Sequence, residues 1–342
     1  MAQPTMQQVA ERAGVSMALV SLVMRGAPNV SEKRRVLVRQ AADDLGYRPN
    51  VLARNLASRR THTLGVVVND LHNPFFAETV EGIQAAADGA AHRILIGNGR
   101  RSKEGEAEAI ETFLQLRVDG LVLAGPLVSL RSMERAADSA AVSVVGRTAR
   151  TSKLDTVNND EAIGARLAVE HLAALGHERI AHIGGGTGAG GAARRRGYED
   201  AMRALDLARH VVVESGDFSE AGGYRAAGEL LARVARPTAI FAANDISAAG
   251  ALDRVEDAGL SVPGDISIVG YDNTALAATH HMSLTTVDQP RADLGRIATE
   301  LLVERLNQGR TNAIHHVIAP TLVERRSSGP PPPHVVSAPG AR

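Results

Sequence analysis

From residue 64 onward, short runs of β-branched and other apolar residues alternate with stretches of helical character. There are two sets of four runs, and within each set the starts lie 21 to 31 residues apart. Strands at this spacing, with helices between them, are typical of parallel β-α-β units. The pattern predicts an α/β fold with parallel sheets in two similar lobes. The predicted strands are 64–68, 94–97, 121–125 and 142–146, then 180–184, 211–213, 239–243 and 266–270.

The N-terminal region has a different pattern, which predicts three short helices. Thr5, Ser16 and Ser31 suit the N-cap position of a helix, and Gly14 and Gly46 suit the position just after a helix ends. We therefore expect helices over residues 6–13, 17–25 and 32–45. The third helix carries an apolar stripe of Val36, Leu37, Ala41 and Leu45.

The first two of these helices have the spacing of a helix-turn-helix. Such a motif needs a small residue in its first helix, a glycine in the turn and an apolar residue on the inner face of its second helix. Ala10, Gly14 and Val20 meet these needs, and a small core is completed by Val9, Val15 and Val23. Many helical hairpins share this spacing, so the motif alone leaves the class of the domain open.

The formal net charge of zero hides an asymmetry along the chain. Residues 1–60 contain ten basic and four acidic residues, whereas the remainder contains 28 basic and 34 acidic residues. A basic head on an acidic body favours contact between the head and a polyanion such as DNA. Alternatively, the positive charge of residues 1–60 is simply solvated and has no partner.

Composition excludes several other classes of protein. The absence of cysteine excludes disulfides, thiolate metal sites and cysteine nucleophiles. No basic leader and no apolar run of about 18 residues is present, so we expect a cytoplasmic protein without a membrane span. We predict a helix-turn-helix domain over 1–49, a hinge over 50–63, a two-lobed domain over 64–326 and a disordered Pro-rich tail over 327–342.

Several motifs occur in the order found in one known family. The N-terminal region contains VA-x-x-AGVS, LGY-x-PN and A-R-x-LA, and the body contains Asn73-Pro74-Phe75-Phe76, GHERIAHIG and PGDISIVGYDN. Nearly the whole chain apart from the tail thus resembles the lac-repressor family of transcriptional regulators. The resemblance implies a headpiece that binds DNA, a hinge helix and a two-lobed core that resembles periplasmic binding proteins.

The resemblance implies a set of DNA contacts. The second helix of such a motif lies in the major groove with its N-terminal side chains at the base edges, which here are Met17, Ala18 and Leu22. Leu22 departs from the family, where an arginine is common, so the operator sequence stays open. These three residues could instead pack against other helices. The phosphate contacts implied are Thr5, Ser16, Ser21 and Arg25.

The hinge carries a second set of implied DNA contacts. In the family this segment forms a helix on operator DNA and inserts an apolar side chain into the minor groove, which here corresponds to Leu56. Asn50, Ala53 and Arg54 accompany it. The alternative is a solvated linker whose leucine packs on the core.

Polar residues follow the predicted strands, where open parallel sheets bind ligands. We expect a small-molecule effector, most simply a sugar or polyol, because carboxylates, amides and arginine suit its hydroxyl groups. Phe75 and Phe76 could pack on a ring face. Some of these residues could instead cap helices or tie the lobes together. The polar candidates, partly from strand ends and partly from the resemblance, are Asp70, Asn98, Arg147, Asp160, Arg194, Asn244, Asp272 and Gln289.

The sequence leaves rival functions open. The effector could be a nucleobase or nucleoside, and it could promote DNA binding or activation instead of releasing a repressor. A sugar-binding transport protein and a sugar-processing enzyme are further alternatives. The glycine-rich loop 184–191 lacks the Lys-Ser/Thr of a phosphate-binding loop, and we interpret it as a strand-to-helix loop. We expect no enzyme, metal or cofactor, and a homodimer that binds a palindromic operator.

Overall fold

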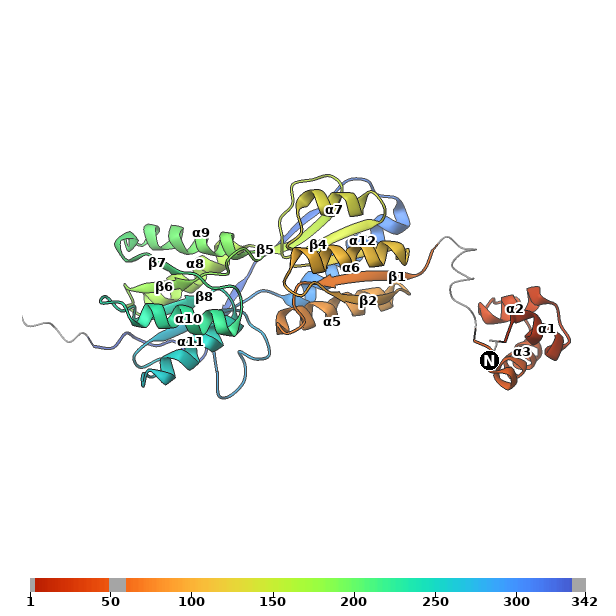
Figure 1. The fold of residues 1–342 in the computed structure, drawn as a ribbon, viewed down its shortest axis with the longest axis horizontal. Coiled ribbons are helices and arrows are strands. Elements are labelled where there is room, and N and C mark those ends of the chain that lie inside the picture. Colours follow the sequence, from red (N-terminus) through yellow and green to blue (C-terminus); the bar gives the residue numbers. More distant parts are fainter. Residues whose placement is uncertain (1–3, 49–59, 334–342) are drawn as a thin grey trace, which may run out of the picture. The chain divides into compact units, whose positions relative to one another are not determined.

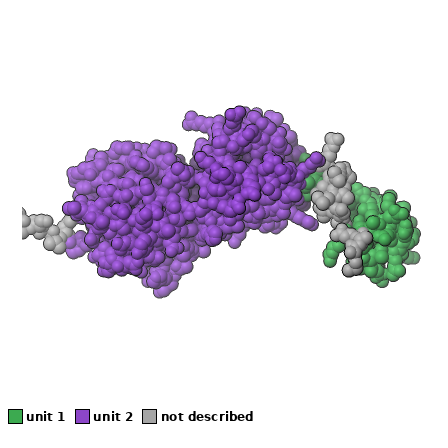
Figure 2. Space-filling model, viewed as in Figure 1, with its two compact units in different colours: residues 1–61 green, residues 62–342 purple. Residues whose placement is uncertain are grey.

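The computed structural model describes residues 4–48 and 60–333, and the chain divides into two compact units, Met1–Thr61 and His62–Arg342 (Figure 2). The hinge residues Asn50, Ala53, Arg54 and Leu56 lie outside the described residues, so their predicted roles stay predictions. Each unit has its own apolar core.

The first unit is a three-helix headpiece, with α1 over Met6–Ala13, α2 over Met17–Met24 and α3 over Glu32–Leu45. The predicted caps are present: Thr5 and Gln8 form a reciprocal capping box, and the Ser16 hydroxyl accepts a hydrogen bond from Leu19 N. Gly14 ends α1 in the left-handed conformation. The helix-turn-helix prediction is therefore confirmed.

The core of the headpiece follows the predicted spacing in its first two helices. Val9, Ala10, Val20 and Val23 are buried together. The predicted stripe on α3 is partly wrong, because Val36 is 54% exposed and Leu37 is 46% exposed. The helix instead turns Val38, Ala41 and Ala42 towards the core.

The second unit contains two six-stranded sheets, each covered by helices on both faces (Figure 1). The first sheet has the order β11-β5-β4-β3-β1-β2, and the second has the order β12-β10-β9-β8-β6-β7. All neighbouring strands are parallel except the β10–β12 pair. We call the parts of the unit around these sheets the first lobe and the second lobe.

The first lobe places alternate strand residues on opposite faces of its sheet. Val66 packs with the helices α5 and α12, whereas Val67 packs with α6 and α7. Its strands are β1 Thr63–Val68, β2 Arg93–Asn98, β3 Gly120–Ala124, β4 Ala141–Val145, β5 Asp155–Asn159 and β11 His315–Ile318. Its helices are α5 Pro74–Gly89, α6 Lys103–Gln115, α7 Leu130–Ala137 and α12 Arg291–Gln308.

Two helices of the first lobe, α5 and α12, come from distant parts of the sequence and pack very closely. A β-carbon at Gly82 of α5 would lie 1.9 Å from the carbonyl oxygen of Ala292 in α12. Glycine is required here because any larger residue would force the helices apart.

The second lobe repeats this architecture. Its strands are β6 Ile180–Ile183, β7 Val212–Glu214, β8 Ala239–Ala242, β9 Ser267–Asp272, β10 Thr285–Asp288 and β12 Thr321–Val323. Its helices are α8 Glu161–Ala174, α9 Gly191–Ala204, α10 Glu220–Leu231 and α11 Asp245–Asp257. The eight predicted strands are therefore all present, and four further strands, β5, β10, β11 and β12, were not predicted.

The chain passes between the lobes three times: after β5, after β10 and after β11. Each lobe is consequently built from separate stretches of sequence. The first lobe needs α12 and β11 from the C-terminal part of the chain to complete its core and its sheet.

The start of the predicted tail differs from expectation. Ser327 is 2% exposed; its hydroxyl donates to Ile268 O at 2.6 Å and accepts from Thr285 N at 2.8 Å. His177 Nε2 lies 2.8 Å from Gly329 O. The polar Ser-Ser-Gly sequence is thus ordered by hydrogen bonds to the second sheet, which apolar patterning does not reveal.

Candidate functional site

A cavity of about 160 Å³ lies between the two lobes. This interlobe cavity has room for many water molecules, since about 10–15 Å³ suffices for one. Its walls come from the carboxyl ends of strands in both sheets, where open α/β sheets bind ligands. The polar and aromatic residues that line it are Asn69, Asp70, Asn73, Phe75, Phe76, Arg101, Glu161, Thr187, Arg194, Asp217, Phe218, Asn244, Asp272 and Gln289.

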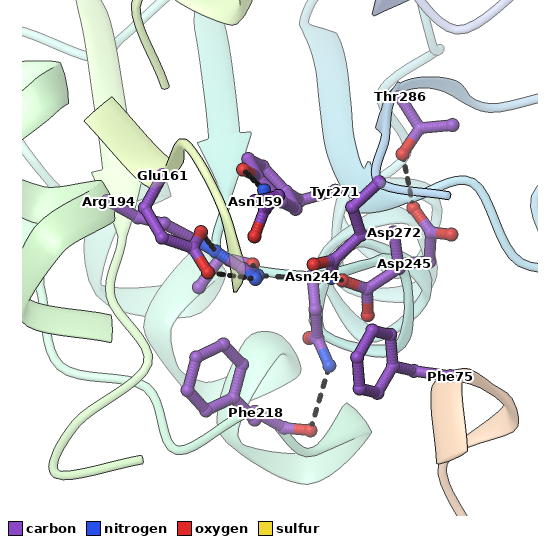
Figure 3. Close-up of polar contacts among 12 residues, drawn as sticks. Phe75, Asn159, Glu161, Arg194, Phe218, Asn244, Asp245, Tyr271, Asp272 and Thr286 are labelled. Carbon is purple, nitrogen blue, oxygen red and sulfur yellow. Dashed lines mark hydrogen bonds and ion pairs between the residues drawn. The ribbon is translucent and has the colours of Figure 1, made fainter. Parts of the chain in front are cut away.

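Arg194 of α9 is the most constrained charged group in this cavity (Figure 3). Its Nε and Nη2 donate to the Glu161 carboxylate at 2.6 and 3.3 Å. Its Nη1 donates to Ala243 O at 2.5 Å and lies 3.6 Å from Asp272 Oδ1. The guanidinium also lies 3.7 Å from the Tyr271 ring centroid, a cation–π geometry. The side chain is therefore held in place by protein groups on several sides.

Burial alone would disfavour the charge on Arg194, but the nearby carboxylates of Glu161 and Asp272, with Tyr271, outweigh it. They raise the pKa of Arg194 above its ordinary value. The guanidinium thus remains charged, and it pairs with the Glu161 carboxylate on the cavity wall.

Asp272, at the end of β9, is 3% exposed and accepts a hydrogen bond from Gln289 Nε2 at 2.5 Å. Burial raises its pKa well above the ordinary aspartate range, because the gain from nearby Arg194 does not offset desolvation and the repulsion of Asp245. Asp245 is tied to the hydroxyl of Thr286 at 2.6 Å and to the backbone N–H of Thr274 at 2.7 Å. Asp272 is consequently suited to donate or accept a hydrogen bond near neutral pH.

The glycine-rich loop between β6 and α9 is a strand-to-helix loop, as predicted. A β-carbon at Gly185 would lie 2.2 Å from the Phe218 ring, and one at Gly188 would lie 2.6 Å from it. The glycines therefore make room for an aromatic ring at the cavity wall. Phe75 and Phe76 supply an edge-to-face pair on the opposite lobe, with their ring centroids 5.1 Å apart.

Charged side chains join the lobes across the cavity. Arg101 of the first lobe donates from Nη2 to Asp217 O at 2.5 Å, and the same nitrogen lies 3.4 Å from Asp217 Oδ2. Glu78 of α5 accepts from Ala275 N of the second lobe at 3.1 Å and from Arg291 Nε at 2.7 Å. The observed arrangement is thus one in which the lobes are in contact.

Seven of the ten predicted effector-site residues line the interlobe cavity: Asp70, Phe75, Phe76, Arg194, Asn244, Asp272 and Gln289. Asn98, Arg147 and Asp160 are not among its lining residues. Asn98 accepts from Arg100 N at 2.9 Å, Arg147 donates to Pro126 O at 3.0 Å, and Asp160 caps α8 by accepting from Ile163 N at 3.0 Å. Short backbone contacts therefore hold these three side chains.

Sequence reasoning missed Arg101, Glu161, Asp217 and Phe218 at the cavity. Asp217 and Phe218 follow β7, so a wider search past that predicted strand would have found them. Glu161 adjoins the first crossing between the lobes. Arg101 follows β2 but is brought to the cavity through its contact with Asp217 of the other lobe.

The headpiece has its own candidate site on α2. Met17, Ala18 and Leu22 are exposed, and Ser21 is partly exposed. Arg25 Nε donates to Ser21 O at 3.2 Å. Thr5 and Ser16 serve as helix caps. The structure carries no nucleic acid, so the predicted contacts of these residues with DNA stay predictions.

Within residues 4–48 and 60–333, no group of His, Asp or Glu side chains is arranged to hold a metal ion. No helix in the same two stretches is long and apolar enough to cross a membrane.

A helix-turn-helix unit joined to two parallel-sheet lobes defines the class of DNA-binding regulators with a periplasmic-binding-protein-like core. Residues 5–50 match the family model for bacterial regulatory proteins of the lacI family, and residues 169–328 match that for a periplasmic binding protein-like domain. The HTH-type transcriptional regulator GalR of Salmonella typhimurium (strain SL1344) is 35% identical over 332 residues, which is 96% of each chain. The protein belongs to the LacI family and is a DNA-binding transcriptional regulator.

Solved structures agree with this assignment. The Lac repressor dimer bound to operator and the anti-inducer ONPF matches with a TM-score of 0.85 and 28% identity, covering 96% of this chain and 100% of that one. The complex of the transcriptional regulator CelR with cellobiose matches with a TM-score of 0.70 and 30% identity, covering 95% and 100% of the two chains. These relatives are a repressor and a transcriptional regulator.

Proposed function

We propose that this regulator is a cytoplasmic repressor whose affinity for operator DNA is controlled by a small neutral polyhydroxy ligand, a sugar or polyol, in the interlobe cavity. The supporting observation is the composition of the cavity wall. Fixed carboxylates, amides and a guanidinium stand beside Phe75, Phe76 and Phe218. Such a wall offers hydrogen bonds to hydroxyl groups and apolar faces to a sugar ring.

The charges on the wall favour a neutral ligand over an anionic one. Arg194 is already paired with Glu161 and Asp272, and Arg101 with Asp217. Neither guanidinium is left to neutralise a phosphate or carboxylate of the ligand. The CelR relative, whose structure holds cellobiose, is consistent with a sugar.

A nucleobase or nucleoside is the alternative ligand, because the same amides and aromatic rings suit a planar heterocycle. The direction of control also has an alternative, in which the ligand promotes DNA binding or activation. We favour release, because a ligand that touches both lobes selects one lobe-to-lobe angle. That angle sets the separation of the hinge segments that precede β1 in a dimer. The coupling between the two sites is typically about 1–3 kcal/mol.

We also infer a homodimer, which a palindromic operator requires by symmetry. The Lac repressor relative was solved as a dimer on its operator. Sedimentation of the full chain at micromolar concentration should show a dimer, and a stable tetramer would refute this part of the proposal.

The proposal is tested by finding a ligand and then removing one contact to it. Sugars, polyols and nucleosides are screened by thermal shift of the full chain, and operator binding is then titrated with the best compound. Asp70→Asn should weaken the response to ligand at least tenfold while leaving operator affinity without ligand unchanged. Asp138→Asn is the matched control, because Asp138 is an exposed aspartate paired with Lys153 outside the cavity.

Two outcomes would overturn the proposal. A nucleoside that shifts operator affinity where no sugar or polyol does would assign the other ligand class. An Asp70→Asn protein that responds at the same ligand concentration as wild type would remove this residue from the site.

A further inference from the structure

The exposed face of α2 is apolar, although this helix belongs to the DNA-reading motif. Its sequence, MALVSLVM, contains a single polar residue, Ser21. Met17 is 52% exposed and Leu22 is 38% exposed. Ala18, the residue after Met17, is also exposed. These side chains do not belong to the headpiece core, which uses Val20 and Val23 of the same helix.

Several polar groups next to this face have partners within the protein. The Ser16 hydroxyl accepts from Leu19 N at 3.3 Å as the cap of α2. Arg25 Nε donates to Ser21 O at 3.2 Å at the other end of the helix. Gln8 is held in the capping box of α1. Apart from the Ser21 hydroxyl, the exposed face of α2 therefore consists mainly of methyl and methylene groups, which it would present to the bases in a major groove.

Base edges differ in how they tolerate such a surface. Guanine, adenine and cytosine present hydrogen-bonding groups in the major groove, and covering them with apolar side chains removes water without replacing its hydrogen bonds. Thymine alone adds an apolar group, its C5 methyl. The headpiece has the charge to approach DNA, because residues 1–60 carry a net charge of +6.

We propose that Met17, Ala18 and Leu22 read the C5-methyl groups of pyrimidines in each operator half-site, so that sequence is recognised by methyl contacts more than by hydrogen bonds. This inference rests on the headpiece binding DNA through α2. It distinguishes thymine from uracil, which has the same hydrogen-bonding groups without the methyl. It also predicts that 5-methylcytosine replaces thymine better than cytosine does.

The test uses the full chain and duplexes that it selects from a random palindromic library. The selected half-site should contain thymine at positions facing α2, and replacing one such thymine by uracil should weaken binding about fourfold for each methyl group removed. When the same T·A pair is exchanged for C·G, methylating that cytosine should restore part of the affinity.

Matched variants assign the methyl contact to a side chain. Leu22→Ala should bring the uracil penalty at one thymine to within twofold, because the variant has no leucine side chain for that methyl group to touch. Leu37→Ala removes the same atoms from an exposed leucine on α3, 46% exposed in wild type, and should keep the full penalty. Exposed positions make misfolding of either variant a small concern, and circular dichroism checks it.

The outcomes separate this inference from the proposed function. If uracil throughout the half-sites leaves affinity within twofold, or if both leucine variants keep the same penalty, methyl reading is refuted while DNA binding stands. A selected half-site without thymine facing α2 also refutes it. If no duplex is enriched at all, DNA binding through this headpiece fails instead.

Discussion

Arg194→Met should destabilise the second unit strongly, because it leaves the buried carboxylate of Glu161 without its cation. The side chains of Arg194, Glu161 and Asp272 are only 5%, 13% and 4% exposed. Removing one partner of a buried ion pair costs about 3–5 kcal/mol, since the remaining charge cannot be hydrated. We expect a loss of that size in the free energy of unfolding near neutral pH.

The assay is urea unfolding of the full chain, followed by circular dichroism at a fixed protein concentration, because dimerisation would add to the apparent stability. Arg166→Met is the matched control. Arg166 pairs with Glu170 on α8 at 3.0 Å, but the two side chains are 51% and 42% exposed. Its loss should cost no more than about 0.5 kcal/mol.

A second variant separates charge from packing. Glu161→Gln added to Arg194→Met removes the stranded carboxylate and should recover part of the stability. If Arg194→Met cost no more than Arg166→Met, the argument from buried charge would be wrong. A weaker ligand response in an Arg194 variant would also reflect a loosened second lobe, so Asp70 is the better position for testing ligand contact.

Three further predictions follow from the same unit. Arg101→Gln should change ligand affinity by no more than about fivefold. The side chains of Arg101 and Asp217 are 39% and 51% exposed, so their ion pair is worth about 0–1 kcal/mol. A change of more than about tenfold, measured by calorimetry, would mean that Arg101 contacts the ligand. Burial raises the pKa of Asp272 to about 8 in the folded protein, whereas the unfolded value is near 4. The preference of the folded state for the protonated carboxyl therefore stabilises the protein fully below about pH 4, and this stabilisation is lost as the pH rises to about 8. The free energy of unfolding of wild type should therefore fall relative to that of Asp272→Asn across that range. If the two proteins had parallel profiles of unfolding free energy against pH, this prediction would be wrong. Gly82→Ala should lower the free energy of unfolding by at least about 1–3 kcal/mol, because the added methyl group forces α5 away from Ala292 of α12. A thermal midpoint equal to that of wild type would show that the two helices can separate without cost.

The longest strand that sequence reasoning missed is a polar one. β5, Asp155–Asn159, reads DTVNN, yet all five residues are buried. Asp155 is compatible with burial because Arg305 and Arg310 each donate two hydrogen bonds to its carboxylate. Those arginines lie about 150 residues further along the chain, so no local pattern could have indicated the strand.

The cavity was predictable wherever a polar residue directly followed an apolar strand, as at Asp70, Asn244 and Asp272. That rule depends only on parallel strands ending at one edge of a sheet. The rule failed for Arg147, which also follows a strand. Its guanidinium donates a hydrogen bond to the carbonyl oxygen of Pro126 and does not line the cavity. The rule also missed Phe218, because the ring's place at the wall depends on the absence of side chains at Gly185 and Gly188.

The three crossings between the lobes have a consequence for how the protein is made on the ribosome. We expect the headpiece, which has its own apolar core, to fold early in synthesis, whereas the first lobe must wait for α12, whose Leu294, Ala298 and Leu302 complete its core. About 130 residues separate the end of β5 from the start of α12, and their synthesis takes roughly 7–26 s at about 5–20 residues per second. During that interval the nascent first lobe exposes the apolar face that α12 later covers. We expect this half-made lobe, rather than the finished protein, to be the species that engages chaperones.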